Sequence, residues 1–262
     1  MTSDTRRAAL AHPDIIEIWG RTVQGMTRPF RCGTDDGHAY YVKSRGAGWR
    51  SLVCEWVAGS LAQDMGLPVA HFAQVSLDQG MADVLRFKGE HDLVAGLSFG
   101  SRIATHTREF EPSLLMQCDE QFRRDLVAFD WWVRNADRTL GVLSGNPNLL
   151  WDPKAEAPVV IDHNMAFDCD FDAEQFLQTH VFRADLEMIA GDPQLRSDYE
   201  LRFACLLNAF SEIWAQLPEN WVFDEDDQPR VDPNEFRAVL ERIHHPGFWP
   251  RFPDPTRPAH VT

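Results

Sequence analysis

Long apolar runs, paired cysteines and an excess of basic residues are all missing from this sequence of 262 residues. No stretch approaches 18 apolar residues, so the sequence predicts no membrane-spanning helix. The first 13 residues are polar, and we expect no signal peptide. The five cysteines show no C-x-x-C spacing, which favours free thiols and a cytoplasmic location.

Basic residues are scarce relative to acidic ones. The 25 Lys and Arg residues face 40 Asp and Glu residues, which gives a formal net charge of −15. Such a surface repels phosphate backbones, and the sequence contains no basic cluster, so we expect no direct nucleic-acid partner and no membrane partner. Hydrophobic residues make up 44% of the chain, which is typical of a globular protein rather than a disordered one.

The apolar pattern changes along the chain from strand-like to helix-like. Short apolar runs predict strands at 15–23, 30–32, 39–42, 69–75 and 81–87, with one helix at 52–65 among them. Helical spacing then predicts helices at 118–134, 185–189, 199–217 and 233–243. We therefore predict an α+β fold of two lobes with a cleft between them. The sheet-rich lobe is expected at 1–105, the helical lobe at 106–245 and a Pro-rich tail at 246–262.

A polar motif follows the helix predicted at 118–134. Asp137 comes first, Asn146 and Asn148 flank a proline just before an apolar pair, and the apolar run 157–161 ends at Asp162. Two strands joined by the turn at 152–154 would bring these side chains to one end of a hairpin. Taken singly, an Asp-Arg neighbour pair predicts a surface ion pair and Asn-Pro predicts a turn. Their order predicts a hard-oxygen site suited to Mg²⁺ and to phosphoryl transfer.

These motifs resemble the HipA-like kinases, in particular short variants built around a compact kinase domain. The resemblance lies in Asn135-x-Asp137-Arg138, in Asn-Pro-Asn-Leu-Leu-Trp at 146–151 and in Ile161-Asp162-His163. Upstream residues follow the same order, namely Gly25–Pro29, Tyr41–Lys43, Glu55, Gly66–Pro68 and Phe99–Ser101. The resemblance covers roughly residues 15 to 170 and implies a protein-kinase-like fold that binds ATP and Mg²⁺.

The resemblance also implies a role for each matching residue of the motif. Asp137 matches the catalytic aspartate that accepts or orients the proton of the acceptor hydroxyl, and Arg138 supports its loop. Asp162 matches the metal-binding aspartate, with Asn146 or Asn148 as a second metal ligand. The sequence leaves the choice between the two asparagines open.

The nucleotide-binding residues are expected upstream. Lys43 matches the lysine that contacts the α- and β-phosphates, and Glu55 on the following helix is expected to pair with it. A Gly-x-Gly-x-x-Gly loop is missing, so residues 25–29 must cover the phosphates, with Thr27 or Arg28 and backbone amides as donors.

The sequence therefore predicts an ATP- and Mg²⁺-dependent kinase that resembles Ser/Thr protein kinases and modifies an unidentified protein substrate. One alternative is a lipid or small-molecule acceptor, because the Asp-Arg…Asn order is similar to that of phosphatidylinositol kinases. The other is a nucleotide-binding protein without turnover, because residues 140–145 form an apparent insertion in the catalytic loop. The sequence does not indicate an oligomeric state.

Two other groups of residues have a structural interpretation. His163 and His180 lie among Asp168, Asp170 and Asp172, fit no metal-site spacing and are expected on a solvated acidic loop. Trp131 and Trp132 are expected to pack in the core of the helical lobe.

Overall fold

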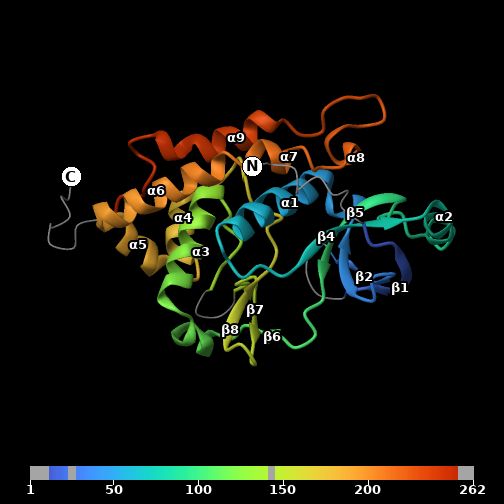
Figure 1. Ribbon diagram of the computed structural model, residues 1–262, viewed down its shortest axis with the longest axis horizontal. Helices are drawn as coiled ribbons and strands as arrows, with labels where there is room; N and C mark the ends of the chain where they lie inside the picture. Colours follow the sequence, from blue (N-terminus) through green and yellow to red (C-terminus); the bar gives the residue numbers. More distant parts are fainter. Residues whose placement is uncertain (1–11, 23–27, 141–144, 253–262) are drawn as a thin grey trace, which may run out of the picture. The chain divides into compact units, whose positions relative to one another are not determined.

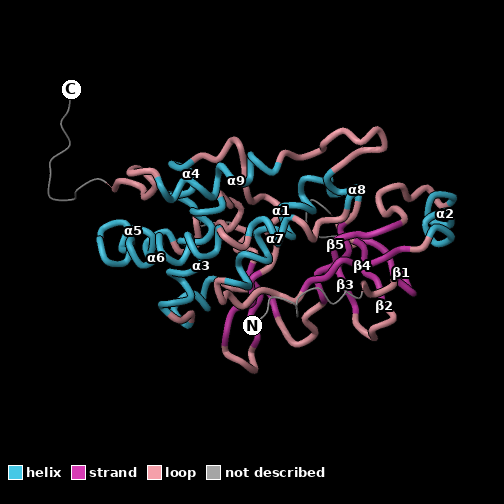
Figure 2. The backbone as a smooth tube through the Cα atoms, turned by 45° about the horizontal axis from the view of Figure 1, so that its top comes forward, coloured by secondary structure: helices cyan, strands magenta, loops and turns pink. Residues whose placement is uncertain are grey.

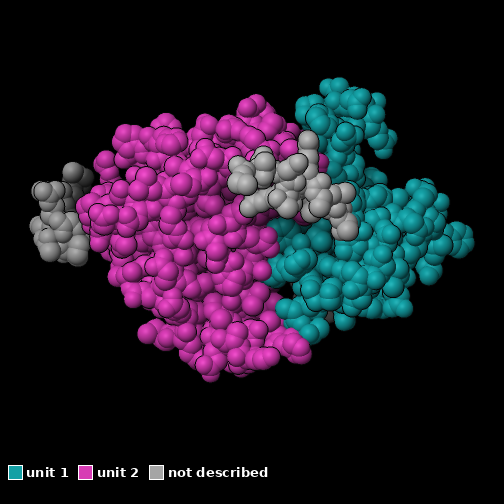
Figure 3. All heavy atoms as spheres, viewed as in Figure 1, with its two compact units in different colours: residues 1–53, 70–105, 218–230 teal, residues 54–69, 106–217, 231–262 magenta. Residues whose placement is uncertain are grey.

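A computed structural model of the chain describes residues 12–22, 28–140 and 145–252. The chain divides into two compact units, each built from separate segments (Figure 3). Unit 1 contains residues 1–53, 70–105 and 218–230, and unit 2 contains residues 54–69, 106–217 and 231–262. The predicted α+β class is confirmed, because an antiparallel sheet comes first and the C-terminal region is mainly helical (Figure 2).

Unit 1 is organised around a five-stranded antiparallel sheet, whose strands are labelled in Figure 2. Their order in the sheet is β1-β2-β3-β5-β4. Its strands are β1 (Ile15–Arg21), β2 (Phe30–Thr34), β3 (Ala39–Lys43), β4 (Phe72–Leu77) and β5 (Gly96–Arg102). Alternation along the strands directs one set of apolar side chains, including Cys32, Val42 and Val75, into a buried cluster. In β3, the last residue, Lys43, pairs with Phe99 of β5.

A helix in unit 1 corrects one sequence prediction. Residues 81–87 were predicted as a strand, but they lie in α2 (Gln79–Phe87). The Asp78 carboxylate starts this helix by accepting a hydrogen bond from the Met81 amide at 3.0 Å. Ala82 and Leu85 then face the sheet core, whereas Phe87 is 92% exposed, which is a helical and not an alternating pattern.

Helix α1 (Trp49–Asp64) crosses the boundary between the segments of the two units. It begins three residues before the predicted start at Leu52 and ends close to the predicted stop. Gly66, with φ of +90°, ends it, because Leu67 N then bonds to Ala62 O and Gly66 N to Gln63 O. A glycine is suited to this position because other residues resist positive φ.

Unit 2 contains a three-stranded sheet and most of the helices. Its sheet has the order β6-β7-β8, made by Arg108–Glu109, Leu149–Asp152 and Ala157–Val160. Its further helices are α3 (Glu120–Val133), α4 (Ala173–Thr179), α5 (Arg183–Gly191), α6 (Pro193–Leu207), α7 (Phe210–Trp214) and α9 (Pro233–Glu241). Short 3₁₀ turns occupy Pro112–Gln117 and Arg242–His244. The short α8 (Glu219–Val222) belongs to unit 1.

Aspartates begin four of the unit 2 helices. Asp119, Asp172, Asp192 and Asp232 each accept a hydrogen bond from a backbone amide in the first turn. Part of the acidic surplus in the composition therefore supplies helix caps.

The C-terminal helical region also corrects a prediction. Residues 199–217 were predicted as one helix, but α6 ends at Leu207 and α7 starts at Phe210. At the junction Ala209 N bonds to Leu206 O, an i−3 bond that tightens the last turn of α6.

The predicted packing of the tryptophan pair is confirmed. Trp132 is fully buried, stacks on Phe203 with 4.5 Å between ring centroids and donates its Nε1 proton to Leu240 O. Trp131 donates to Phe248 O, so the described part of the tail packs on unit 2.

All five cysteines are free thiols, and Cys32, Cys54 and Cys118 are buried as small core residues. Within the described ranges, no helix combines the length and the apolar character needed to cross a bilayer.

Candidate active site

The β7–β8 hairpin brings the two ends of the polar motif together (Figure 1). The Asp152 carboxylate closes its turn by accepting hydrogen bonds from Lys154 N and Ala155 N. At the open end, Ile161 N donates to Asn148 O at 3.1 Å. Asn148 precedes the first strand and Asp162 follows the second, so the hairpin places both at the same end, as predicted from the sequence.

Asn148 also lies against Asp137. Its Nδ2 donates to Asp137 Oδ2 at 2.7 Å. The exposed Asn146 instead accepts from Thr139 N through its backbone carbonyl and from Asn148 N through Oδ1 at 3.4 Å. Asn148 is buried and adopts φ of 48°, a left-handed conformation that asparagine tolerates better than most residues. The structure therefore brings Asn148, rather than Asn146, onto the predicted catalytic aspartate.

The side chain of Arg138 holds the backbone of the motif through hydrogen bonds. It is fully buried, and its Nη1 donates to Asn148 O at 2.6 Å and to Ile161 O at 2.9 Å. Its Nη2 lies 3.4 Å from Asp162 O. A planar guanidinium can serve several fixed acceptors at once, and here it holds the backbone on both sides of the hairpin opening.

The counter-ion of Arg138 could not be assigned from the sequence. Asp130 on α3 is fully buried, and its Oδ2 accepts hydrogen bonds from Arg138 Nε at 2.9 Å and from His180 Nε2 at 3.0 Å. A signal was present, because Asp130 is the one charged residue in the apolar run 126–133. Carboxylates are rarely buried unless they are paired, so such a position indicates a buried cation elsewhere in the chain.

The two histidines of the expected acidic loop are both buried, which corrects their placement. His163 is 2% exposed and His180 is 1% exposed. Among the residues that the structure describes, no group of three or more His, Cys, Asp or Glu side chains could hold a metal. Two of the aspartates accept hydrogen bonds from backbone amides instead. Asp168 accepts from Asp170 N, and Asp172 caps α4 by accepting from Glu174 N.

Glu55 is buried as well, and it contacts the residue after Asp162. Its Oε2 accepts a hydrogen bond from His163 N at 2.8 Å. A carboxylate on the surface of a helix would be exposed, but Glu55 is 2% exposed. The structure instead places a carboxylate of α1 on the backbone that carries the predicted metal ligand.

The predicted nucleotide-binding residues lie in different parts of the molecule. Lys43, at the end of β3, is buried and belongs to unit 1, whereas Glu55 belongs to unit 2, so their pairing stays a prediction. Thr27 lies outside the described residues. Arg28 is exposed and adopts φ of 41°. The next residue, Pro29, accepts a hydrogen bond from Thr22 N through its carbonyl.

Asp137 and Asp162 are both half-buried, in contrast with the buried groups beneath them. Together with the Asn148 amide they supply hard oxygen donors, the type that Mg²⁺ prefers. Two carboxylates and an amide do not complete a six-coordinate shell, and in nucleotide sites the remaining ligands are phosphate oxygens and water. The donor set therefore fits a Mg²⁺–nucleotide complex better than a bare protein-bound cation.

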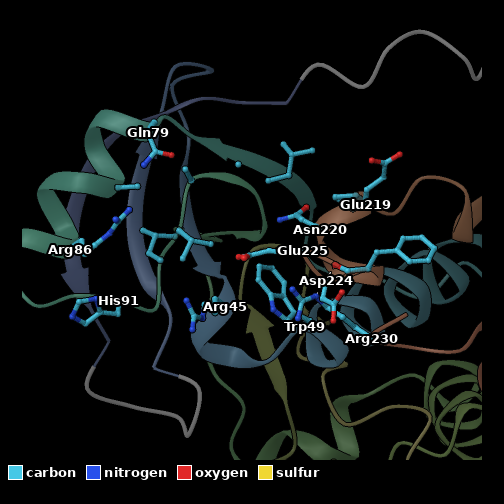
Figure 4. Close-up of a pocket in the computed structure, with 18 of the residues that line it drawn as sticks. Arg45, Trp49, Gln79, Arg86, His91, Glu219, Asn220, Asp224, Glu225 and Arg230 are labelled. Atoms are coloured by element: carbon cyan, nitrogen blue, oxygen red, sulfur yellow. Dashed lines mark hydrogen bonds between the residues drawn. The ribbon is translucent and has the colours of Figure 1, made fainter. Parts of the chain in front are cut away.

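A cavity of about 1540 Å³ in unit 1 is separate from these residues (Figure 4). The start of α1, the loop before β5 and residues 218–230 line it, and Arg230 lies over the Trp49 ring at 5.2 Å. None of the predicted site residues contributes to its lining.

An N-terminal antiparallel sheet, a helical region and a hairpin with this polar motif define a kinase-like α+β protein. Residues 15–252 match the protein family described as HipA-like kinase, which is nearly the whole chain. The chain belongs to this family, and the resemblance seen in the motifs is confirmed. No curated protein matches the chain.

Proposed function

We propose that this protein is an ATP- and Mg²⁺-dependent kinase that transfers the γ-phosphoryl group to a serine or threonine hydroxyl of a protein. One observation supports this most strongly. Asn148 Nδ2 lies 2.7 Å from Asp137 Oδ2, while Arg138 binds the carbonyls of Asn148 and Asp162. One buried guanidinium therefore holds the backbone that carries Asn148 and Asp162, and Asn148 in turn holds the Asp137 carboxylate.

Asp137 is the group that orients the acceptor hydroxyl. The hydrogen bond from Asn148 restrains its carboxylate, and half-burial leaves it within reach of a substrate. A carboxylate held in one orientation can accept the hydroxyl proton as the hydroxyl oxygen attacks the γ-phosphorus. Positioning and charge stabilisation then supply most of the rate in phosphoryl transfer.

Asp162 and Asn148 are the protein ligands proposed for Mg²⁺. When bound there, the cation neutralises negative charge on the phosphates. Glu55 and Arg138 hold the backbone around Asp162 from two sides, through His163 N and Asp162 O. Lys43 is proposed to bind the nucleotide phosphates, with Arg28 and Thr27 as further donors.

We propose a protein acceptor rather than a lipid. The formal net charge of −15 disfavours contact with an anionic membrane surface. No direct contact with nucleic acid is proposed, for the same electrostatic reason.

The test is incubation of the protein with γ-labelled ATP and Mg²⁺ in three arms: alone, with a cell lysate and with phosphatidylinositol vesicles. The variants are Asp137→Asn and Asp162→Asn, with Asp170→Asn, an exposed carboxylate nearby in sequence, as the matched control. Transfer to protein should fall about 10²- to 10⁴-fold in the first two variants and stay unchanged in the control.

Each alternative has its own outcome. Labelling of the vesicles but not of protein would show a lipid kinase. ATP binding by the wild type without transfer, hydrolysis or self-labelling would show a protein without turnover. Absence of nucleotide binding would refute the proposal altogether.

A further inference from the structure

The carboxylate of Asp130 is fully buried yet has three hydrogen-bonding partners. Oδ1 accepts from Asn135 Nδ2 at 2.9 Å, and Oδ2 accepts from Arg138 Nε and His180 Nε2. Burial alone would raise the pKa of Asp130, but the charge of Arg138 and these hydrogen bonds hold it below its usual value. Asp130 is therefore ionised in the folded protein.

The contacts of His180 define the position of its single proton. Phe182 N donates to His180 Nδ1 at 3.1 Å, so that nitrogen is an acceptor. The proton then resides on Nε2 and is donated to Asp130. Burial also lowers the pKa of His180 in spite of the nearby carboxylate, which agrees with a neutral ring.

The backbone around His180 pairs with the loop that carries Asp137. Val181 N donates to Arg138 O at 3.0 Å, Leu140 N donates to Thr179 O at 3.0 Å, and Thr139 and His180 form an antiparallel bridge. Residues 179–181, which lie 17 to 19 residues after Asp162, therefore pair with the loop that carries Asp137.

Arg138 transmits this arrangement to the hairpin. Four of the five donor hydrogens of a guanidinium are used, one toward Asp130 and three toward the carbonyls of Asn148, Ile161 and Asp162. If Asp130 or His180 changes, the guanidinium can rotate, and the residues it holds can shift.

We propose that His180 and Asp130 are positioning residues of the phosphoryl-transfer site and act on it through Arg138. The expected loss of kcat rests on the proposed function, whereas the expected movement of Arg138 does not. Neither residue touches the reacting atoms. They fix the orientation of the Arg138 guanidinium, and the guanidinium holds the backbone of the proposed Mg²⁺ ligands.

The kinetic test compares His180→Ala and His180→Gln with the wild type. Displacement of the site by about 1 Å costs on the order of 10²-fold in rate, so we expect kcat of His180→Ala to fall about 10- to 100-fold. KM for ATP should rise by a smaller factor than kcat falls, because the other proposed nucleotide contacts, Lys43 and residues 25–29, lie in other segments of the chain. The glutamine amide can still donate to Asp130, so His180→Gln should recover most of kcat.

The matched control is Phe176→Leu. Phe176 is fully buried and stacks on the His180 ring with 4.6 Å between centroids. Its one hydrogen bond to His180 runs from His180 N to the Phe176 backbone carbonyl, which a leucine keeps. This variant disturbs the same packing and should lower stability without lowering kcat. Equal loss of kcat in Phe176→Leu and His180→Ala, at equal loss of Tm, would overturn the proposal, as would full kcat in His180→Ala.

Hydrogen exchange gives a readout that does not need activity. Exchange at Ile161 N, whose acceptor is the Arg138-bound carbonyl of Asn148, should speed up in His180→Ala and in Asp130→Asn but not in Phe176→Leu. If the wild type transfers no phosphate, the proposed function fails while this comparison still decides the positioning role. Unchanged exchange at Ile161 in both cluster variants would refute it.

Discussion

At the scale of single residues, Asn146 and Asn148 are distinguished by what they contact. Asn148 is buried against Asp137, whereas Asn146 is exposed. We predict that Asn148→Gly lowers kcat about 10²- to 10³-fold and raises the Mg²⁺ concentration needed for half-maximal rate. Glycine tolerates φ of 48°, so the change removes the amide without straining the backbone. Asn146→Gly is the paired control, and equal losses in the two variants would contradict the assignment.

His180 also predicts a dependence of stability on pH. Burial places its pKa in the folded protein below the ordinary 6.5, so between these two values the unfolded chain binds more protons than the folded one. Stability should therefore fall as the pH is lowered through 6.5. Urea unfolding at pH 7.5 and 5.5 measures this, and the loss should shrink in His180→Gln.

His71 provides a comparison for that experiment. Burial lowers the pKa of His71 too, with a further contribution from the charge of Arg102. The His71→Gln variant should also reduce the pH dependence, but it should leave kcat unchanged. A pH dependence that is identical in wild type and His180→Gln would contradict the neutral, buried ring.

At the scale of elements, sequence reasoning succeeded where the determinants were local. The hairpin was predictable because an Asp-Pro turn joins two short apolar runs, and the Asp152 carboxylate closes that turn through its neighbours. The contact between Asp130 and His180 spans 50 residues, and no local pattern specifies the partner of a buried carboxylate. The candidate site was therefore predictable in its order along the chain but not in the cluster beneath it.

Helix α2 shows how a local signal can still be misinterpreted. The run 81–87 was predicted as a strand, yet the Asp78 cap and the packing of Ala82 on the sheet fix a helix. We predict that Asp78→Ala lowers the free energy of unfolding by about 1 kcal/mol, measured by urea denaturation. Asp83→Ala, which removes an exposed i,i+3 pair with Arg86, should cost less than about 0.5 kcal/mol. A larger effect for Asp83 would argue against the cap.

At the scale of the whole molecule, unit 1 is not continuous in sequence. Residues 218–230 belong to unit 1, although they follow most of unit 2 in the sequence. Trp221 in this segment is fully buried, and its Nε1 donates to Leu97 O at 2.8 Å. Arg230 N bonds to Val222 O within the same segment. The sheet-rich region therefore depends on a piece of chain that lies more than a hundred residues downstream.

This dependence predicts that a fragment of residues 1–105 does not unfold cooperatively. The fragment lacks Trp221, and it exposes Val57 and Leu61 of α1, which are fully buried in the whole chain. In the full-length protein, Trp221→Ala should lower the free energy of unfolding by about 3–5 kcal/mol, because it leaves a large cavity. Trp221→Phe keeps most of the ring volume and loses the bond to Leu97 O, so its cost should be closer to about 1 kcal/mol. A cooperative urea transition in the 1–105 fragment would show that the strands of unit 1 do not need the C-terminal segment.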